Sequence, residues 1–115
     1  MSASKKHIRE NFRDATFKRD GYRCRCCGRS QEQVALDAHH ITDRTEMPNG
    51  GYVKENGISL CNEPHADGAE SCHMKAEKFH ISGGKEWEPG MHPDDLYKLV
   101  GSSYESAVKA SDRLR

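Results

Sequence analysis

Five cysteines and seven histidines in a chain of 115 residues constrain this fold more than any other feature of the sequence. The number of cysteines is odd, and the first residues, Met-Ser-Ala-Ser-Lys-Lys, lack the apolar segment of a signal peptide. A disulfide framework is therefore not expected, whereas thiols accompanied by imidazoles are typical of metal sites in a reducing compartment. We expect a soluble cytoplasmic protein that binds metal.

The apolar content is low for a folded domain. Hydrophobic residues make up 34% of the chain and charged residues 31%, and the mean hydropathy is -0.96. Each ordered residue costs roughly 1–2 kcal/mol of backbone entropy, so a core this small needs another source of stability, which a structural metal would supply. The length predicts one domain. No segment approaches the roughly 20 apolar residues of a membrane span.

Cys24 and Cys27 have the spacing of one half of a tetrahedral zinc site, because two intervening residues let both sulfurs reach one ion at about 2.3 Å. Cys61 and Cys72 are the candidates for the second half, and the ten residues between them would have to loop outward. A closed shell of four cysteines leaves no position for water and is therefore structural. The alternative ligands are Cys26, in place of Cys24 or Cys27, and His65.

Hydrophobic periodicity and turn signals predict a mixed α/β chain. Four helices are expected, over residues 8–19, 72–79, 93–100 and 103–114. Residues 34–41 alternate as a strand that ends in two histidines, and residues 58–60 predict a second strand that reaches Cys61. Asn56-Gly57, just before the second strand, is a dipeptide typical of hairpin turns.

A second group of polar residues lies at the end of the first predicted strand, after a loop and on a predicted helix. Its members are His39, His40, Asn56, His73, Glu77 and His80. The last three recur at i, i+4 and i+7, so they share one face of the helix expected over residues 72–79, and such a face can hold a divalent cation beside a phosphate. Adjacent residues of a strand point to opposite faces, so both strand histidines reach one site only if the backbone turns there. One histidine would then bind the metal while the other remained free as a base.

Basic charge is concentrated at the start of the chain. Residues 1–29 carry nine Lys and Arg against three Asp and Glu, and residues 30–115 carry nine against fifteen, so the formal net charge is zero. A basic segment favours contacts with phosphates. A solvated helix face would show the same asymmetry.

Four motifs, in this order along residues 12–80, resemble the zinc-containing HNH endonucleases. They are Tyr22-Arg-Cys-x-x-Cys-Gly28, Ala38-His-His-Ile41, Asn56-Gly-Ile-Ser-Leu-Cys61 and Cys72-His73. The resemblance implies an α+β fold, a small ββα-metal core with a structural four-cysteine zinc site and flanking helices. It also implies a disordered N-terminus (residues 1–7), a nuclease domain (8–82) and a linker with a C-terminal helical extension (83–115).

The resemblance further assigns roles to individual residues. His40 takes the place of the general base, His39 and His73 those of metal ligands, and Asn56 that of the asparagine that orients the loop of the base. Many members carry a second histidine where this chain has Glu77, and a carboxylate there favours Mg²⁺ or Mn²⁺. His80 is the alternative ligand. Candidate DNA contacts are Arg44, Lys75 and Lys78.

The implied activity is metal-dependent hydrolysis of DNA, with nicking by a monomer or double-strand cleavage by a homodimer. Phage or bacterial hosts are the expected setting. Two other interpretations remain open. A non-catalytic, zinc-stabilised nucleic-acid-binding module would need neither the base nor the asparagine, and a metal-independent protein-interaction domain would agree with the neutral net charge.

Overall fold

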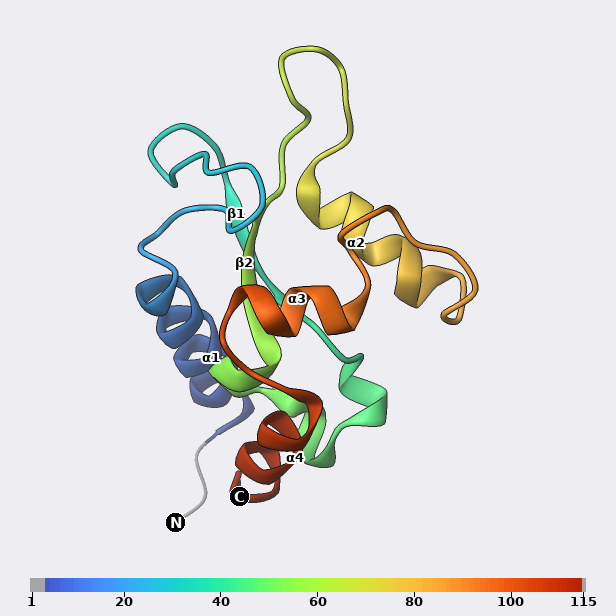
Figure 1. Ribbon diagram of the computed structural model, residues 1–115. Coiled ribbons are helices and arrows are strands. Elements are labelled where there is room, and N and C mark those ends of the chain that lie inside the picture. The colour runs from blue at the N-terminus through green and yellow to red at the C-terminus, as the bar shows by residue number, and fades with distance from the viewer. Residues whose placement is uncertain (1–3, 115) are drawn as a thin grey trace.

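The computed structural model describes residues 4–114 and shows an α+β fold in which helices surround one two-stranded hairpin (Figure 1). The elements are α1 (Lys5–Arg19), β1 (Leu36–His40), the 3₁₀ turns η1 (Arg44–Glu46), η2 (Pro48–Gly51) and η3 (Lys54–Asn56), β2 (Gly57–Cys61), α2 (Cys72–Ile81), α3 (Pro93–Leu99) and α4 (Tyr104–Asp112). The predicted fold class is confirmed. Among the helices of residues 4–114, none has the length and apolar character needed to cross a membrane.

The hairpin pairs β1 and β2 in antiparallel register, with Leu36 opposite Cys61 and His40 opposite Gly57. The connection is the long segment 41–56, so the prediction that Asn56-Gly57 forms the hairpin turn is wrong. Gly57 has an extended backbone, with φ −119°. A Cβ atom there would lie 2.5 Å from Thr16 Oγ1 and 2.7 Å from a ring carbon of Phe12. The glycine is therefore needed because α1 packs closely against the first residue of β2.

Helix α1 begins three residues earlier than the periodicity predicted, because the Ser4 side chain accepts a hydrogen bond from the backbone N–H of His7 at 3.2 Å. Residues 5–7 of the segment predicted to be disordered are thus helical, and residues 1–3 lie outside the described residues. At the other end, the buried carboxylate of Asp20 accepts from the backbone N–H of Ser59 at 2.8 Å. This bond ties the end of α1 to β2.

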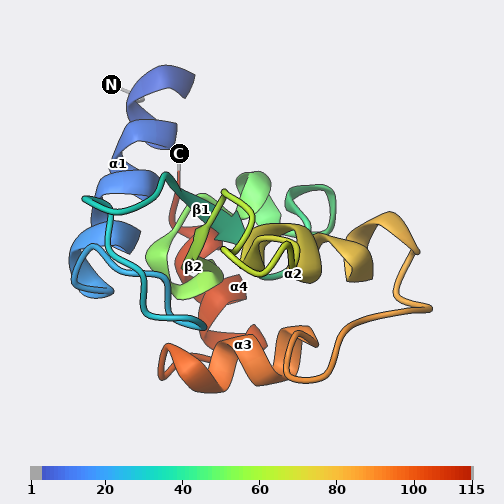
Figure 2. The same cartoon turned by 90° about the horizontal axis from the view of Figure 1, so that it is seen from above.

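The capping residues of the later helices agree with the sequence. The Ser71 side chain accepts from the backbone N–H of Met74 and begins α2 at Cys72, and Ser103 caps α4 in the same way. Figure 2 shows α1 and α2 on opposite sides of the hairpin and α3 along a third side. Leu96 of α3 and Ala107 of α4 belong to the same buried cluster as Ile58 of β2. The C-terminal segment is therefore part of the core that supports the hairpin.

Candidate metal centre and active site

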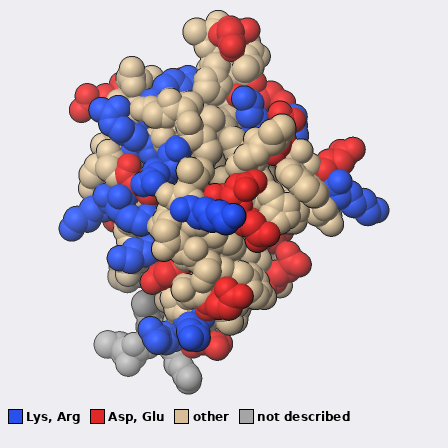
Figure 3. Space-filling model, in the orientation of Figure 1, with Lys and Arg blue, Asp and Glu red and all other residues tan. Residues whose placement is uncertain are grey.

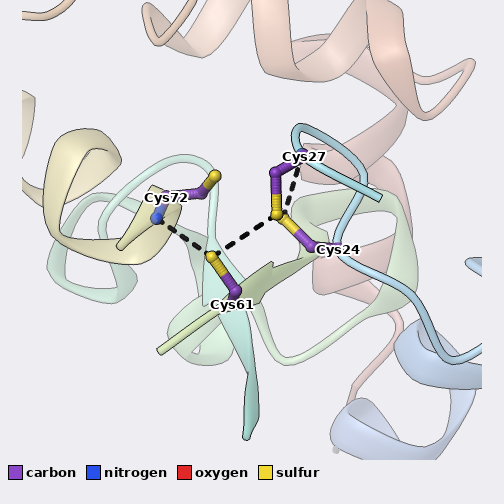
Figure 4. A group of neighbouring side chains, drawn as sticks. All are labelled: Cys24, Cys27, Cys61 and Cys72. Atoms are coloured by element: carbon purple, nitrogen blue, oxygen red, sulfur yellow. Dashed lines mark hydrogen bonds between the residues drawn. The ribbon is translucent and has the colours of Figure 1, made fainter. Parts of the chain in front are cut away.

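Four cysteines from three separate parts of the chain converge beside the hairpin (Figure 4). Cys24 and Cys27 lie in the turn after α1, Cys61 ends β2, and Cys72 is the first residue of α2. Their sulfur atoms all lie within 4.8 Å of one another, and the sulfurs of Cys27 and Cys61 are 3.7 Å apart. Four thiolates at 2.3 Å from a zinc ion would be separated by about 3.8 Å, so the cluster fits tetrahedral zinc.

Several hydrogen-bond donors contact the sulfur atoms of this cluster. The backbone N–H of Cys27 donates to the sulfur of Cys24 at 3.4 Å, and that of Cys72 donates to the sulfur of Cys61 at 3.2 Å. The Arg29 guanidinium also donates to Cys61, at 3.1 Å. Donors of this kind stabilise thiolates, which are the form that binds zinc.

The thiols in and beside this cluster differ in pKa. Hydrogen bonds with Cys26 and Cys72 hold the pKa of the Cys24 thiol well below its usual range. The hydrogen bond with Cys24 raises the pKa of Cys26 to about 12, and the same partner raises the pKa of Cys72. Zinc would displace the remaining protons, which couples its binding to folding.

The structure favours the four-cysteine set over both alternatives. Cys26 and Cys27 are both exposed, but only Cys27 belongs to the group of four converging sulfurs. His65 lies at the edge of the cluster, with Nε2 3.9 Å from the sulfur of Cys61 and 3.8 Å from that of Cys72. The ten residues between these two cysteines form the long loop that projects from the body in Figure 1, as the spacing required.

His39, His73 and Glu77 form the second group that could hold a metal ion among the described residues. One carboxylate oxygen of Glu77 lies 3.1 Å from His39 Nδ1 and 3.3 Å from His73 Nε2. His39 is only 2% exposed, and its Nδ1 is buried without a hydrogen bond of good geometry in residues 4–114. Two imidazoles and a carboxylate oriented toward one point are suitable ligands for a divalent cation.

The charge states of this group follow from its contacts. Burial lowers the pKa of His39. Burial would also lower the pKa of His73, but hydrogen bonds to Asp37 and Glu77 outweigh it and raise the value to about 9. The close contacts with the imidazoles of His39 and His73 hold the pKa of Glu77 well below its usual range. Glu77 is therefore ionised and available as a ligand at neutral pH.

Asp37 is a residue of this site that the sequence did not identify. Its Oδ2 lies 2.9 Å from His73 Nδ1, which leaves Nε2 of the same ring directed toward Glu77. A carboxylate behind a metal-binding imidazole fixes its tautomer and orientation. The signal was present, because Asp37 lies two residues before His39 and therefore on the same face of β1.

His40 packs on the opposite side of β1 from His39. Its ring stacks on Phe12 of α1, with centroids 4.5 Å apart, and meets the edge of Tyr52 at 4.7 Å. Burial lowers the pKa of His40 to about 4, so the imidazole is neutral at pH 7. The residues that line one open hollow are Ala38, His39, His40, Asp43, Arg44, Thr45, His73, Glu77 and His80. Both strand histidines thus reach one site, as expected if the backbone turns where β1 ends.

Asn56 is fully buried and holds the chain just after His40. Its side-chain nitrogen donates to the carbonyl of Thr42 at 3.0 Å, and its side-chain oxygen accepts from the backbone N–H of Thr42 at 3.0 Å. The Tyr97 hydroxyl of α3 donates to the same oxygen at 2.8 Å. These bonds fix the backbone two residues after His40.

The alternative metal ligand and the candidate DNA contacts lie outside the group of converging ligand atoms. His80 Nε2 lies 3.0 Å from the backbone carbonyl of His40, and His80 is not in the group of converging ligand atoms, whereas Glu77 is. Lys78 Nζ lies 2.9 Å from Glu70 and 3.0 Å from Glu88, so its charge is already balanced, contrary to the expectation of a free phosphate contact. Arg44 lines the hollow, whereas Lys75 is not among its lining residues.

The strand–strand–helix unit, with its histidines and adjoining four-cysteine cluster, defines a small ββα protein with two candidate metal sites. Residues 24–67 match the family model of the HNH endonucleases. The matched segment includes His39, His40 and Asn56 and ends before His73. Comparison with curated proteins and with solved structures gives no match. The family implies nuclease activity, a nucleic-acid substrate and a divalent metal, and the four-cysteine cluster suggests zinc.

Proposed function

We propose that this protein is an endonuclease that uses a divalent cation, Mg²⁺ or Mn²⁺, to hydrolyse phosphodiester bonds of DNA. The observation that carries the proposal is the convergence of His39, His73 and Glu77 on the hollow that His40 also lines. The first three residues bind a cation, and His40 is a neutral base. These are the two elements that hydrolysis of a phosphodiester requires.

The ligand set fits a hard divalent cation. The buried His39 Nδ1 lacks a well-formed hydrogen bond within residues 4–114, and the nearby Glu77 is ionised. A carboxylate where many HNH proteins have a histidine favours Mg²⁺ or Mn²⁺ over softer ions. When bound, the cation would stabilise negative charge on the phosphate and on the departing oxygen.

His40 acts as the general base in this proposal. Its neutral imidazole accepts a proton from a water molecule, whose oxygen forms a bond to phosphorus as the bond to the 3′ oxygen breaks. The products carry 5′-phosphate and 3′-hydroxyl ends. Packing against Phe12 and Tyr52 holds the ring, while Asn56 holds the backbone that follows it.

Substrate contacts come from the basic residues near the hollow. Arg44 binds a phosphate next to the scissile one, and Lys75 is a further candidate on α2. One site cuts one strand, so a monomer nicks DNA and a homodimer is required to cut both strands.

The decisive experiment is incubation of the purified protein with supercoiled plasmid, with and without added Mg²⁺ or Mn²⁺. We expect metal-dependent nicking or linearisation, and a loss of roughly a hundred- to ten-thousand-fold in rate for His40→Ala, because a general base is worth about that much. His7→Ala is a matched control, since His7 is an exposed histidine of α1. DNA binding without cleavage under every metal would instead support the non-catalytic zinc-stabilised module.

A further inference from the structure

We propose that a second hollow, next to the candidate active site, binds the nucleotide that adjoins the scissile bond in the same DNA strand. This proposal rests on the proposed function and adds a substrate subsite to it. The hollow has a volume of about 360 Å³ and lies between the start of α1, the turn η2 and the end of the chain. The hydrolysis proposed for the candidate active site does not use this second hollow.

The lining of this hollow fits a nucleotide. Ile8, Tyr52 and Leu114 provide apolar surface, and Lys5 and Arg9 of α1 add cationic groups. Lys5 and Arg9 are exposed, whereas the three apolar side chains are partly buried. A nucleotide presents a flat base beside an anionic phosphate, and single strands are bound by aromatic and apolar surfaces with nearby cations. The combination of lining residues therefore matches the chemistry of the substrate itself.

Tyr52 connects this hollow to the candidate active site. Its ring lines the second hollow and packs edge-on against His40, with centroids 4.7 Å apart. Arg44, which lines the active-site hollow, donates to the Tyr52 hydroxyl at 3.3 Å. The guanidinium carbon of Arg9 lies 5.9 Å from the centre of the same ring. A strand whose scissile phosphate lies beside His40 would therefore place its next nucleotide against Tyr52.

The two arginines are available to a phosphate. Within residues 4–114, neither Arg9 nor Arg44 forms an ion pair with a carboxylate. Figure 3 shows Lys and Arg side chains gathered on the side of the molecule where α1 lies. Guanidinium groups without carboxylate partners are suited to bind phosphates. Arg9 and Arg44 would thus hold a phosphate between the two hollows.

The first test compares Arg9→Gln with Lys18→Gln. Both changes remove one positive charge from an exposed position of α1, but Lys18 lines neither hollow. Affinity for a fluorescent DNA duplex is measured by anisotropy over a range of salt concentrations, without added Mg²⁺ or Mn²⁺, so that no cleavage is needed. Arg9→Gln should weaken binding roughly five- to tenfold and reduce the salt-dependence slope by about 1, because one phosphate contact is lost. Lys18→Gln should change both quantities much less.

The second test locates a DNA nucleobase on the protein surface. DNA substituted with 5-iododeoxyuridine is irradiated with the protein, and crosslinked peptides are identified by mass spectrometry. A crosslink at Tyr52, reduced in Ile8→Trp because the larger side chain fills the hollow, supports the subsite. Equal binding by the Arg9 and Lys18 variants, or crosslinks confined to other surfaces, would overturn it. Because both tests measure binding, a protein that binds in this way but does not cut plasmid would contradict only the nuclease proposal.

Discussion

At the scale of single residues, His80 determines how firmly the backbone of His40 is held. Its Nε2 lies 3.0 Å from the His40 carbonyl, and its ring stacks on His39 with centroids 5.2 Å apart. Because a carbonyl only accepts, Nε2 must carry the proton, and this hydrogen bond adds to the bonds of Asn56. If His40 is the base, as proposed, His80 is therefore a positioning residue for it.

Replacement of His80 by leucine should lower kcat by roughly fivefold, because one partly buried hydrogen bond worth about 1 kcal/mol is lost beside the proposed base. The affinity for DNA should change little. His80→Gln retains a donor near the place of Nε2 and should recover most of the rate. Single-turnover cleavage and DNA binding are measured for both variants. Equal rates for the leucine and glutamine variants would show that the hydrogen bond has no part in positioning His40.

Individual site residues were predictable where one motif fixed their position. The structure brings together His39, His73 and Glu77, as the i, i+4 spacing on α2 and the strand end required. The ion pairs of Lys78 were not predictable, because its partners Glu70 and Glu88 lie eight and ten residues away, in loops whose path the sequence does not reveal. The face of β1 that Asp37 shares with His39 was predictable, but its contact with His73 was not, because that contact depends on where α2 packs against the hairpin.

At the scale of elements, α2 joins the two metal groups. Cys72, its first residue, belongs to the four-cysteine cluster, and His73, its second, belongs to the candidate catalytic group. Loss of zinc would release the start of α2 and displace His73 from His39. The structural cluster therefore supports the geometry of the catalytic group as well as the fold.

Cys61→Ser should abolish zinc binding and cooperative thermal unfolding, because Cys61 lies at the centre of the cluster and structural zinc contributes folding energy directly. Cys26→Ser is the matched control, since Cys26 is exposed and outside the group of four. Zinc is measured by elemental analysis and folding by circular dichroism. We expect one zinc ion per chain in the wild type and in Cys26→Ser. A Cys61→Ser variant that is zinc-free and normally folded would contradict the structural role.

Most elements were predictable because their signals are local. Ser71 and Ser103 cap helices, and the strands have apolar residues next to the motifs. The segment after His40, for which the sequence predicts no helix, folds into three 3₁₀ turns. Its conformation is set by bonds from Asn56 to residues distant in sequence, among them Thr42 at 3.0 Å and Tyr97 at 2.8 Å. Such tertiary bonds leave no periodic pattern in the sequence.

At the scale of the whole molecule, the C-terminal helices support the site. The Tyr97 hydroxyl of α3 donates to Asn56 and lies 2.7 Å from Thr42 Oγ1. Burial raises the pKa of Tyr97 to about 12, so this hydroxyl stays protonated and remains a donor at neutral pH. The expected division of the chain at residue 82 stays a prediction, but a contact from residue 97 to the backbone beside His40 links the two parts in one core.

The stability of the whole molecule should depend on pH through His40. Its pKa is about 4 in the folded state and 6.5 in a free side chain, so the unfolded chain binds the proton more tightly. The free energy of unfolding contributed by the neutral ring is therefore fully present above pH 6.5 and falls as the pH drops toward 4, by up to about 3 kcal/mol. His40→Phe keeps an aromatic ring against Phe12 and removes the titration. Urea unfolding from pH 4 to 7 should thus show a smaller decrease for the variant, while acid-induced zinc loss affects both proteins alike. Parallel curves would show that His40 protonates in the folded protein as easily as in water, which would contradict its burial between Phe12 and Tyr52.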